Sequence, residues 1–133
     1  AFDALTGETR WIADEGAVSP VQVAGNAIFL ISDQAQLVRL DAATGKTVWA
    51  QDRPYFVKEK IKKQAEIHVN LGPVLAGNRL FVVSSDGLLR SFDPASGALL
   101  GQADLPGGAA TDAIVAGQTL YVVSRKGQLL AFR

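Results

Sequence analysis

One short phrase occurs three times in the sequence and decides the fold: Ala1-Phe-Asp-Ala-Leu-Thr-Gly7, Arg39-Leu-Asp-Ala-Ala-Thr-Gly45 and Ser91-Phe-Asp-Pro-Ala-Ser-Gly97. A second phrase recurs as Val23-Ala-Gly-Asn-Ala-Ile-Phe-Leu-Ile-Ser32, Leu75-Ala-Gly-Asn-Arg-Leu-Phe-Val-Val-Ser84 and Val115-Ala-Gly-Gln-Thr-Leu-Tyr-Val-Val-Ser124. The step from Asp3 to Asp41 is 38 residues, from Gly77 to Gly117 it is 40, and from Gly25 to Gly77 it is 52. The sequence therefore repeats a unit of about 40 residues and carries one insertion.

Each unit divides into four short strands separated by turn residues. In the middle unit we expect strands at 72–76, 79–84, 88–93 and 98–104, because these stretches are rich in apolar and β-branched residues. The Asp86-Gly87 pair between the second and third stretch is typical of a tight hairpin. Four-stranded units repeating every 40 to 45 residues or so indicate an all-β protein of the β-propeller class.

The count of strands predicts about three four-stranded antiparallel blades. We expect an outer strand of a preceding blade within residues 1–14 (at about 8–13), a blade at 15–52, an insertion at 53–67, a blade at 68–104, and a blade lacking its outer strand at 105–133. This gives twelve strands in all: one outer strand, four in each of the two complete blades and three in the last. Because such a set leaves two broad apolar faces uncovered, we expect either further blades in a longer parent chain or association of copies. In the second case residues 8–13 of one copy complete the last blade, beside residues 127–132 of another.

The repeated residues have structural roles in this interpretation. The carboxylate in each phrase, from Asp3, Asp41 or Asp93, accepts hydrogen bonds from backbone N–H groups two or three residues on, and the closing glycine takes a left-handed conformation. Trp11 and Trp49 follow the turn at the same spacing, whereas the third unit has Gly101 there. We expect the two indole rings to wedge between neighbouring blades. The predicted structural set is Asp3, Gly7, Trp11, Asp41, Gly45, Trp49, Asp93 and Gly97.

Composition excludes several classes of function. The 133 residues hold 13 basic and 13 acidic side chains, so no net charge attracts nucleic acid, and we expect no nucleic-acid partner. Cys is absent, which excludes disulfides and thiolate chemistry. No apolar stretch reaches the roughly 18 residues of a spanning helix. Met is also absent and the sequence starts at Ala1, so we expect a piece of a longer protein.

The insertion at 53–66 is the most distinctive segment, and we expect a loop or a short amphipathic helix there. It carries five basic and two acidic residues and follows no repeat pattern. A solvated loop over a blade edge is one interpretation, and a surface that meets an acidic partner or lipid headgroups is the other. The possible partner-binding residues are Tyr55, Phe56, Lys58, Lys60, Lys62 and Lys63.

No catalytic, cofactor-binding or metal-binding residues are predicted. His68 is the single histidine, and neither a second metal ligand nor an orienting partner can be identified from spacing. The Gly107-Gly108 pair is followed by no helix whose N-terminus would face an anion, so it is interpreted as a connection between blades.

The repeats resemble the quinoprotein-like (PQQ-like) propeller repeat Ala-x-Asp-x-x-Thr-Gly-x-x-x-Trp, which is matched at Ala1 to Trp11 and nearly so at Arg39 to Trp49. The order of features, with Gly72-Pro-Val-Leu-Ala-Gly-Asn78 and the ending Gly127-Gln-Leu-Leu-Ala-Phe-Arg133, is similar to the C-terminal three blades of the BamB family. These are outer-membrane protein assembly lipoproteins of Gram-negative bacteria.

The resemblance implies a periplasmic, outer-membrane-associated propeller of eight blades. It also implies a lipid anchor on an N-terminal Cys that this chain lacks, and a protein partner, the barrel-assembly protein BamA. No contact residue transfers from the family, because its main partner-binding loops lie on earlier blades. The implied function is a non-catalytic scaffold for protein–protein interaction without a cofactor. The alternatives are a fragment of a PQQ-dependent dehydrogenase and a fragment of a ligand-sensing propeller ectodomain.

Overall fold

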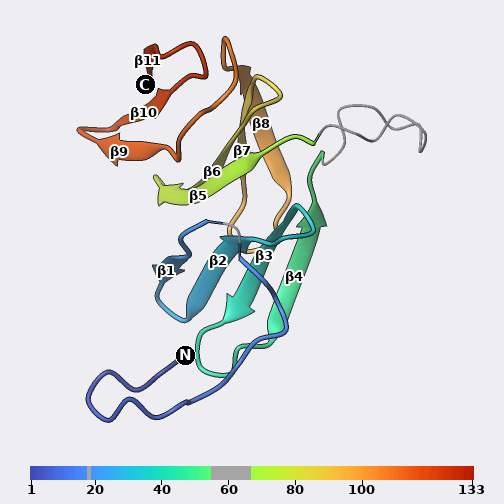
Figure 1. Cartoon of the computed structure of the whole chain (residues 1–133), viewed down its shortest axis with the longest axis vertical. Coiled ribbons are helices and arrows are strands. Elements are labelled where there is room, and N and C mark those ends of the chain that lie inside the picture. The colour runs from blue at the N-terminus through green and yellow to red at the C-terminus, as the bar shows by residue number, and fades with distance from the viewer. Residues whose placement is uncertain (18, 55–66) are drawn as a thin grey trace.

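The structure, a computed structural model, describes residues 1–17, 19–54 and 67–133. The predicted all-β class is confirmed: these residues form eleven strands in three antiparallel sheets. Figure 1 shows the sheets following one another along the long axis of the molecule, with the N-terminal segment at one end and the last sheet at the other.

Blade 1 contains four strands in sequential order. They are β1 (Gln22–Ala24), β2 (Ala27–Ile31), β3 (Gln36–Asp41) and β4 (Thr47–Asp52). Blade 2 repeats this order with β5 (Asn70–Ala76), β6 (Arg79–Ser84), β7 (Leu88–Phe92) and β8 (Leu99–Asp104). Blade 3 contains β9 (Ile114–Ala116), β10 (Thr119–Val123) and β11 (Leu129–Phe132), with β9 and β11 at its two edges. The turn residues placed all four strands of blade 2 to within two residues.

The hairpin after the second strand of each blade is held by a buried serine. The hydroxyl oxygens of Ser32, Ser84 and Ser124 accept hydrogen bonds from the backbone N–H groups of Gln36, Asp86 and Gln128, at 3.2, 3.3 and 3.2 Å. All three serines are at most 1% exposed. Because the hydroxyl is satisfied locally, its burial at the end of an apolar strand does not leave a polar group without a partner.

Packing between blades uses alternate faces of the same strands. Phe29 and Ile31 of β2 lie in a cluster with Leu80 and Phe92 of blade 2. Leu30, between them, packs on the opposite face with Val38, Leu40 and Ala13. A third cluster joins blade 2 to blade 3 and contains Val83, Leu89, Leu105, Ala109, Ala113, Leu120 and Val122. The core is therefore a series of layers between sheets, as the period-two pattern of a strand buried on both faces requires.

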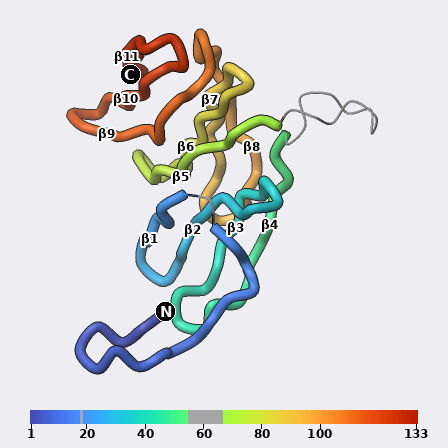
Figure 2. Tube along the Cα trace, viewed as in Figure 1, coloured from blue at the N-terminus to red at the C-terminus, as the bar shows by residue number. Residues whose placement is uncertain are grey.

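One predicted strand is wrong. Residues 8–13 form no strand, so the described chain has eleven strands instead of twelve. This segment folds back on residues 1–3 in a small hairpin, with a single bridge between Phe2 and Thr9. A strand needs a longer partner than this hairpin offers. Figure 2 shows the trace of this N-terminal arm (residues 1–15) running out from blade 1.

Candidate functional site

The three repeated carboxylates close their own turns. Asp41 accepts hydrogen bonds from the N–H groups of Ala43 and Thr44 at 3.1 and 2.9 Å, and from the Thr44 hydroxyl at 2.9 Å. Asp93 accepts from Ala95, Ser96 and the Ser96 hydroxyl in the same manner. The Asp3 carboxylate accepts from Leu5 and Thr6 and forms an ion pair with Arg10 at 2.6 Å. These groups lie in three separate turns and do not converge on one site.

These contacts stabilise the ionised carboxylates. Arg10, followed by the Leu5 and Thr6 amides, lowers the pKa of Asp3 to about 2. The Thr44 hydroxyl is the largest cause of a lowered pKa at Asp41, and the Ser96 hydroxyl has the same effect on the pKa of Asp93. A carboxylate that acts as a general base at neutral pH needs a raised pKa. The pKa values of these three carboxylates are lowered instead, as expected for groups that hold a turn.

Each tryptophan lies against the turn glycine of the following blade. A Cβ on Gly97 would lie 2.8 Å from Cε3 of Trp49, and a Cβ on Gly45 would likewise meet the ring of Trp11. Both glycines have a positive φ, +73° at Gly45 and +74° at Gly97. The Trp11 indole N–H donates to the carbonyl of Ala42 at 3.1 Å. Trp49 Nε1 is buried without a hydrogen-bond partner among the described residues, and its ring lies 6.1 Å from that of Phe29.

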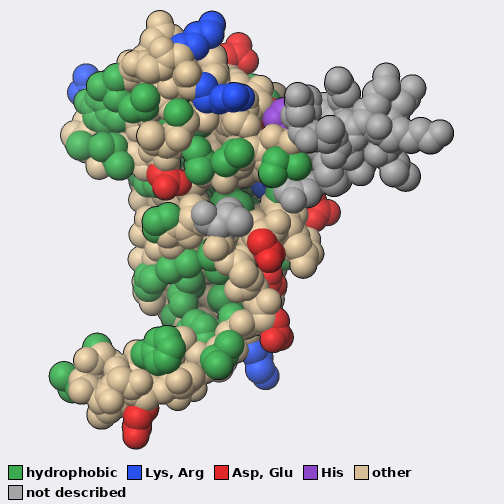
Figure 3. Space-filling view, viewed as in Figure 1, with side chains coloured by type: hydrophobic (Ala, Val, Ile, Leu, Met, Phe, Trp, Pro, Cys, Tyr) green, Lys and Arg blue, Asp and Glu red, His purple; other side chains and the backbone are tan. Residues whose placement is uncertain are grey.

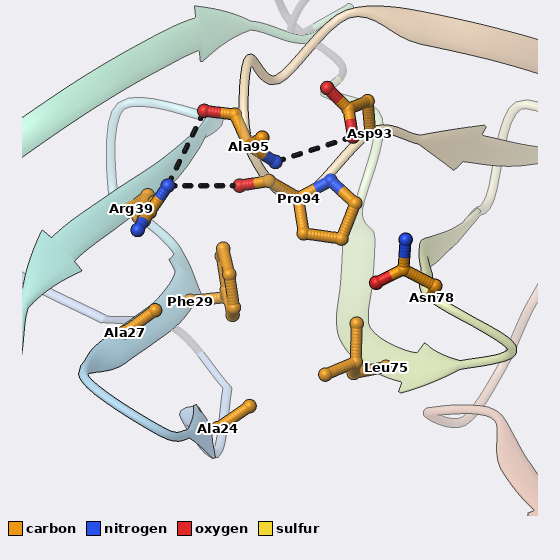
Figure 4. A pocket seen from close by; sticks show the side chains of 9 residues that line it. All are labelled: Ala24, Ala27, Phe29, Arg39, Leu75, Asn78, Asp93, Pro94 and Ala95. Carbon is orange, nitrogen blue, oxygen red and sulfur yellow. Dashed lines mark hydrogen bonds between the residues drawn. The ribbon is translucent and has the colours of Figure 1, made fainter.

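A cavity of about 300 Å³ lies between blades 1 and 2, next to this contact (Figure 4). Its floor is apolar and includes Phe29 and Leu75, and its wall includes Arg39. The Arg39 guanidinium crosses to blade 2, where Nη1 donates to the carbonyls of Pro94 and Ala95 at 3.5 and 3.4 Å. Arg39 has Ser91 and Ala131 as its counterparts in the other repeats, so it belongs to this junction alone.

A buried ion pair lies in blade 2 where blade 1 ends. Arg90 Nη2 is 2.6 Å from Asp86 Oδ2, and the two side chains are 9% and 10% exposed. The guanidinium of Arg53 lies 4.4 Å from the centroid of the Phe92 ring on the same side. Burial, followed by repulsion from Arg90, lowers the pKa of Arg53. The blade 1 counterparts of Asp86 and Arg90 are Gln34 and Val38, so this pair is also an exception within the repeat.

His68 precedes β5 and lines a cavity of about 190 Å³ with Asp33 and Asn70. Within residues 1–17, 19–54 and 67–133, no group of three or more His, Cys, Asp and Glu side chains is arranged to hold a metal ion. The same part of the chain holds no helix that is long and apolar enough to cross a membrane. The predicted partner-binding residues Tyr55, Phe56, Lys58, Lys60, Lys62 and Lys63 lie outside the described residues.

Apolar side chains are exposed at both ends of the molecule. Phe2, Leu5 and Ile12 of the N-terminal arm are 71%, 98% and 82% exposed, and Ile114 and Leu129 of blade 3 are 66% and 68% exposed. Figure 3 shows apolar side chains on the arm and along one side of the blades. Exposed apolar area of this kind is typical of surfaces that contact other molecules.

The functional interpretation missed two arginines, Arg39 at the junction of blades 1 and 2 and Arg90 in the buried ion pair of blade 2. Arg39 and Arg90 have no special spacing of their own. The signal that identifies them is the comparison of repeats, in which each replaces a smaller side chain at the matching position.

Comparison with known families supports the same interpretation of the fold. The model of a family described as outer membrane protein assembly factor BamB matches residues 1–133. The assembly factor BamB of Alkalilimnicola ehrlichii is 29% identical over 129 residues, which are 96% of this chain and 30% of that protein. An uncharacterised protein, RP232 of Rickettsia prowazekii, is 30% identical over 91 residues, or 67% of this chain and 22% of that protein.

Among solved structures, BamB from Moraxella catarrhalis superposes with a TM-score of 0.75. The match covers 98% of this chain and 42% of that one at 21% identity, and it shows the fold. The chain spans less than a third of the length of the curated relatives it matches.

Proposed function

The chain belongs to the BamB family, and from this membership we propose that it is part of a non-catalytic propeller scaffold for protein–protein interaction in outer-membrane protein assembly. The observation that carries the proposal is the match of the family model to the whole chain. The structure supports it physically, because rigid sheets with variable connections present surfaces to other proteins without any cofactor.

The proposed partner is a barrel-assembly protein of the BamA type, and the proposed location is the periplasmic side of the outer membrane. The exposed apolar side chains of the arm and of blade 3 supply contact area, and the insertion at 53–66 supplies a local excess of basic residues. Membrane attachment in the parent protein is proposed to come from a lipid anchor.

The experiment is capture of purified BamA by the immobilised 133-residue chain. We expect retention above that on a matrix carrying an unrelated propeller of similar charge. Loss of all BamA in the wash, with the chain shown to be folded by circular dichroism, would contradict the proposal for this part of the protein.

A catalytic alternative, a fragment of a PQQ-dependent dehydrogenase, makes a different prediction. A ligand that binds only the native state raises the melting temperature. We expect PQQ with Ca²⁺ to leave the melting temperature unchanged, because the repeated carboxylates are engaged in turns. A saturable rise would favour the enzyme or a ligand-sensing domain.

We also propose that isolated copies of this chain associate through the free edge of β11 and the N-terminal arm. β11 has one strand neighbour, β10, and residues 8–13 form no strand in the described chain. A free edge is a template for pairing with another chain. Light scattering should then give a mass above 14.0 kDa, and a monodisperse monomer contradicts this assembly.

A further inference from the structure

The two junctions between blades are built from matching residues but are not filled equally. The junction between blades 1 and 2 contains Leu37, Leu80 and Phe92, and each of these side chains is 0% exposed. Their counterparts at the junction between blades 2 and 3 are Leu89, which follows Leu37 by 52 residues, and Leu120 and Phe132, which follow Leu80 and Phe92 by 40 residues.

The first junction is filled by an indole ring. Trp49 packs against the cluster that contains these three residues and against the ring of Phe29. In the sheet, Trp49 lies opposite Arg39. The position that matches Trp49 in blade 2 is Gly101, and it lies opposite Ser91. Blade 2 has therefore lost the bulky side chain on each of the two paired strands.

The second junction holds a cavity of about 560 Å³, whereas the first, against whose cluster Trp49 packs, holds one of about 300 Å³. Leu89 and Leu120, each 6% exposed, and the ring of Phe81 form its apolar lining with Phe132. The lining also includes the guanidinium-bearing side chains of Arg79 and Arg133 and no acidic side chain. The complete lining is Ala76, Gly77, Arg79, Phe81, Leu89, Val115, Gln118, Leu120, Phe132 and Arg133.

We propose that this cavity, which we call the blade 2–3 pocket, binds an aromatic side chain of a partner protein, flanked by acidic residues in an extended segment. The aromatic group would pack as Trp49 does between blades 1 and 2. Its contacts would be Leu89, Leu120 and Phe132, the counterparts of Leu37, Leu80 and Phe92. The acidic neighbours follow from charge complementarity with Arg79 and Arg133. An aromatic side chain in an apolar pocket is the usual anchor of such an interface.

This inference deepens the proposed function in that the partner is a protein, but its test requires no assembly component. The probe is an acetylated and amidated pentapeptide, Gly-Glu-Trp-Glu-Gly, added to the isotope-labelled 133-residue chain. We expect saturable changes in the backbone amide resonances of Gly77, Val115 and Leu120. The pentapeptide with Ala in place of Trp should bind at least about tenfold more weakly, as for truncation of a central aromatic anchor.

Two variants locate the binding. Gly101→Trp restores the residue type of the first junction, and the backbone accepts a side chain there, because a Cβ on Gly101 would meet only the Ser91 hydroxyl, at 3.6 Å. We expect this variant to fold and to bind the peptide at least about tenfold more weakly, since its own ring fills the pocket. Arg79→Glu should also weaken binding, whereas Arg125→Glu, at an exposed arginine of another loop, is the matched control and should not.

Three results would overturn the proposal. Equal binding of the Trp and Ala peptides would exclude an aromatic anchor, and unchanged binding by both Gly101→Trp and Arg79→Glu would place the peptide elsewhere. Resonances of the pocket that shift on dilution of the chain alone would show that a second copy occupies it. If the peptide does not bind, the proposal for the pocket fails but the BamA capture experiment is unaffected. If the peptide binds and BamA is not captured, only the proposed function is contradicted.

Discussion

The Trp49 ring of blade 1 lies directly on the Cα of Gly97 in blade 2, so close that a Cβ at residue 97 would be 2.8 Å from the ring. Gly97 also has a φ of +74°, which L side chains rarely adopt. The repeated glycine therefore has two separate reasons to lack a side chain, one in its own turn and one in the neighbouring blade.

Replacing Gly97 by Ala tests this double requirement. The backbone strain costs about 1–2 kcal/mol and the forced shift of the ring adds about 1–3 kcal/mol, so we expect the free energy of unfolding to fall by roughly 2–5 kcal/mol. The matched control is Gly25→Ala, which has a φ of +56° but no atom within 4 Å of its Cβ. It should cost about 1–2 kcal/mol. If both variants lost the same free energy of unfolding in urea, the Trp49 ring would be shown to move aside without an energetic cost.

The buried pair of Arg90 and Asp86 gives a second prediction. Asp86→Gln leaves the guanidinium buried without its carboxylate, and we expect it to destabilise the protein by about 3–5 kcal/mol. Asp86→Gln combined with Arg90→Val installs the residues that blade 1 has at these positions, Gln34 and Val38, and should recover most of that loss. Urea unfolding measures both variants. If the double variant were no more stable than Asp86→Gln alone, this account of the ion pair would be contradicted.

The Asp3–Arg10 ion pair predicts a pH dependence. The folded-state pKa of Asp3, about 2, lies below its ordinary value of 3.8, so the stabilising effect of the ionised carboxylate is present above pH 4 or so. That effect is lost as the pH falls through 2. Carbon-detected NMR titration of the carboxylate should give a midpoint near 2. Arg10→Ala should move the midpoint upward, since Arg10 is the largest cause of the shift; an unmoved midpoint would assign the shift to the turn amides.

The insertion gives a prediction that separates binding from folding. Reversing Lys58, Lys60, Lys62 and Lys63 to Glu changes the local charge of the segment from positive to negative without touching any repeated turn. We expect BamA capture to weaken, with a melting temperature that changes little. The control is reversal of Lys46 and Lys126, which lie in other turns. Undiminished capture by the fourfold variant would remove the insertion as a contact surface.

The sequence predicts the strands of this fold well where turn chemistry repeats. Positions such as Gly77-Asn78 and Asp86-Gly87 interrupt apolar runs and fix the hairpins, so blade 2 could be predicted to within two residues. Residues 8–13 were assigned to a strand because they follow the repeat pattern. They form no strand, because a strand also needs a neighbouring strand to pair with, and a sequence pattern does not show whether one is present.

The contacts between blades could be predicted only in part. The Trp-to-glycine contact follows from equal spacing in two units, although the sequence does not tell which glycine receives the ring. Arg39 binds carbonyls that lie 55 and 56 residues away, and the blade 2–3 pocket is lined by residues of two different sheets. Such features depend on the packing of one sheet against the next. The residue pattern within either sheet does not determine that packing.

The contact between Trp49 and Gly97 joins unlike surfaces, the outer strand of one blade and the turn of the next. A tandem duplication of a unit that carries both a turn glycine and the Trp after it, as Gly45 and Trp49 do, copies both halves of such a joint at once, so the new blade can dock on each side. The number of blades can therefore change in a single genetic event, without coordinated mutations in the other blades.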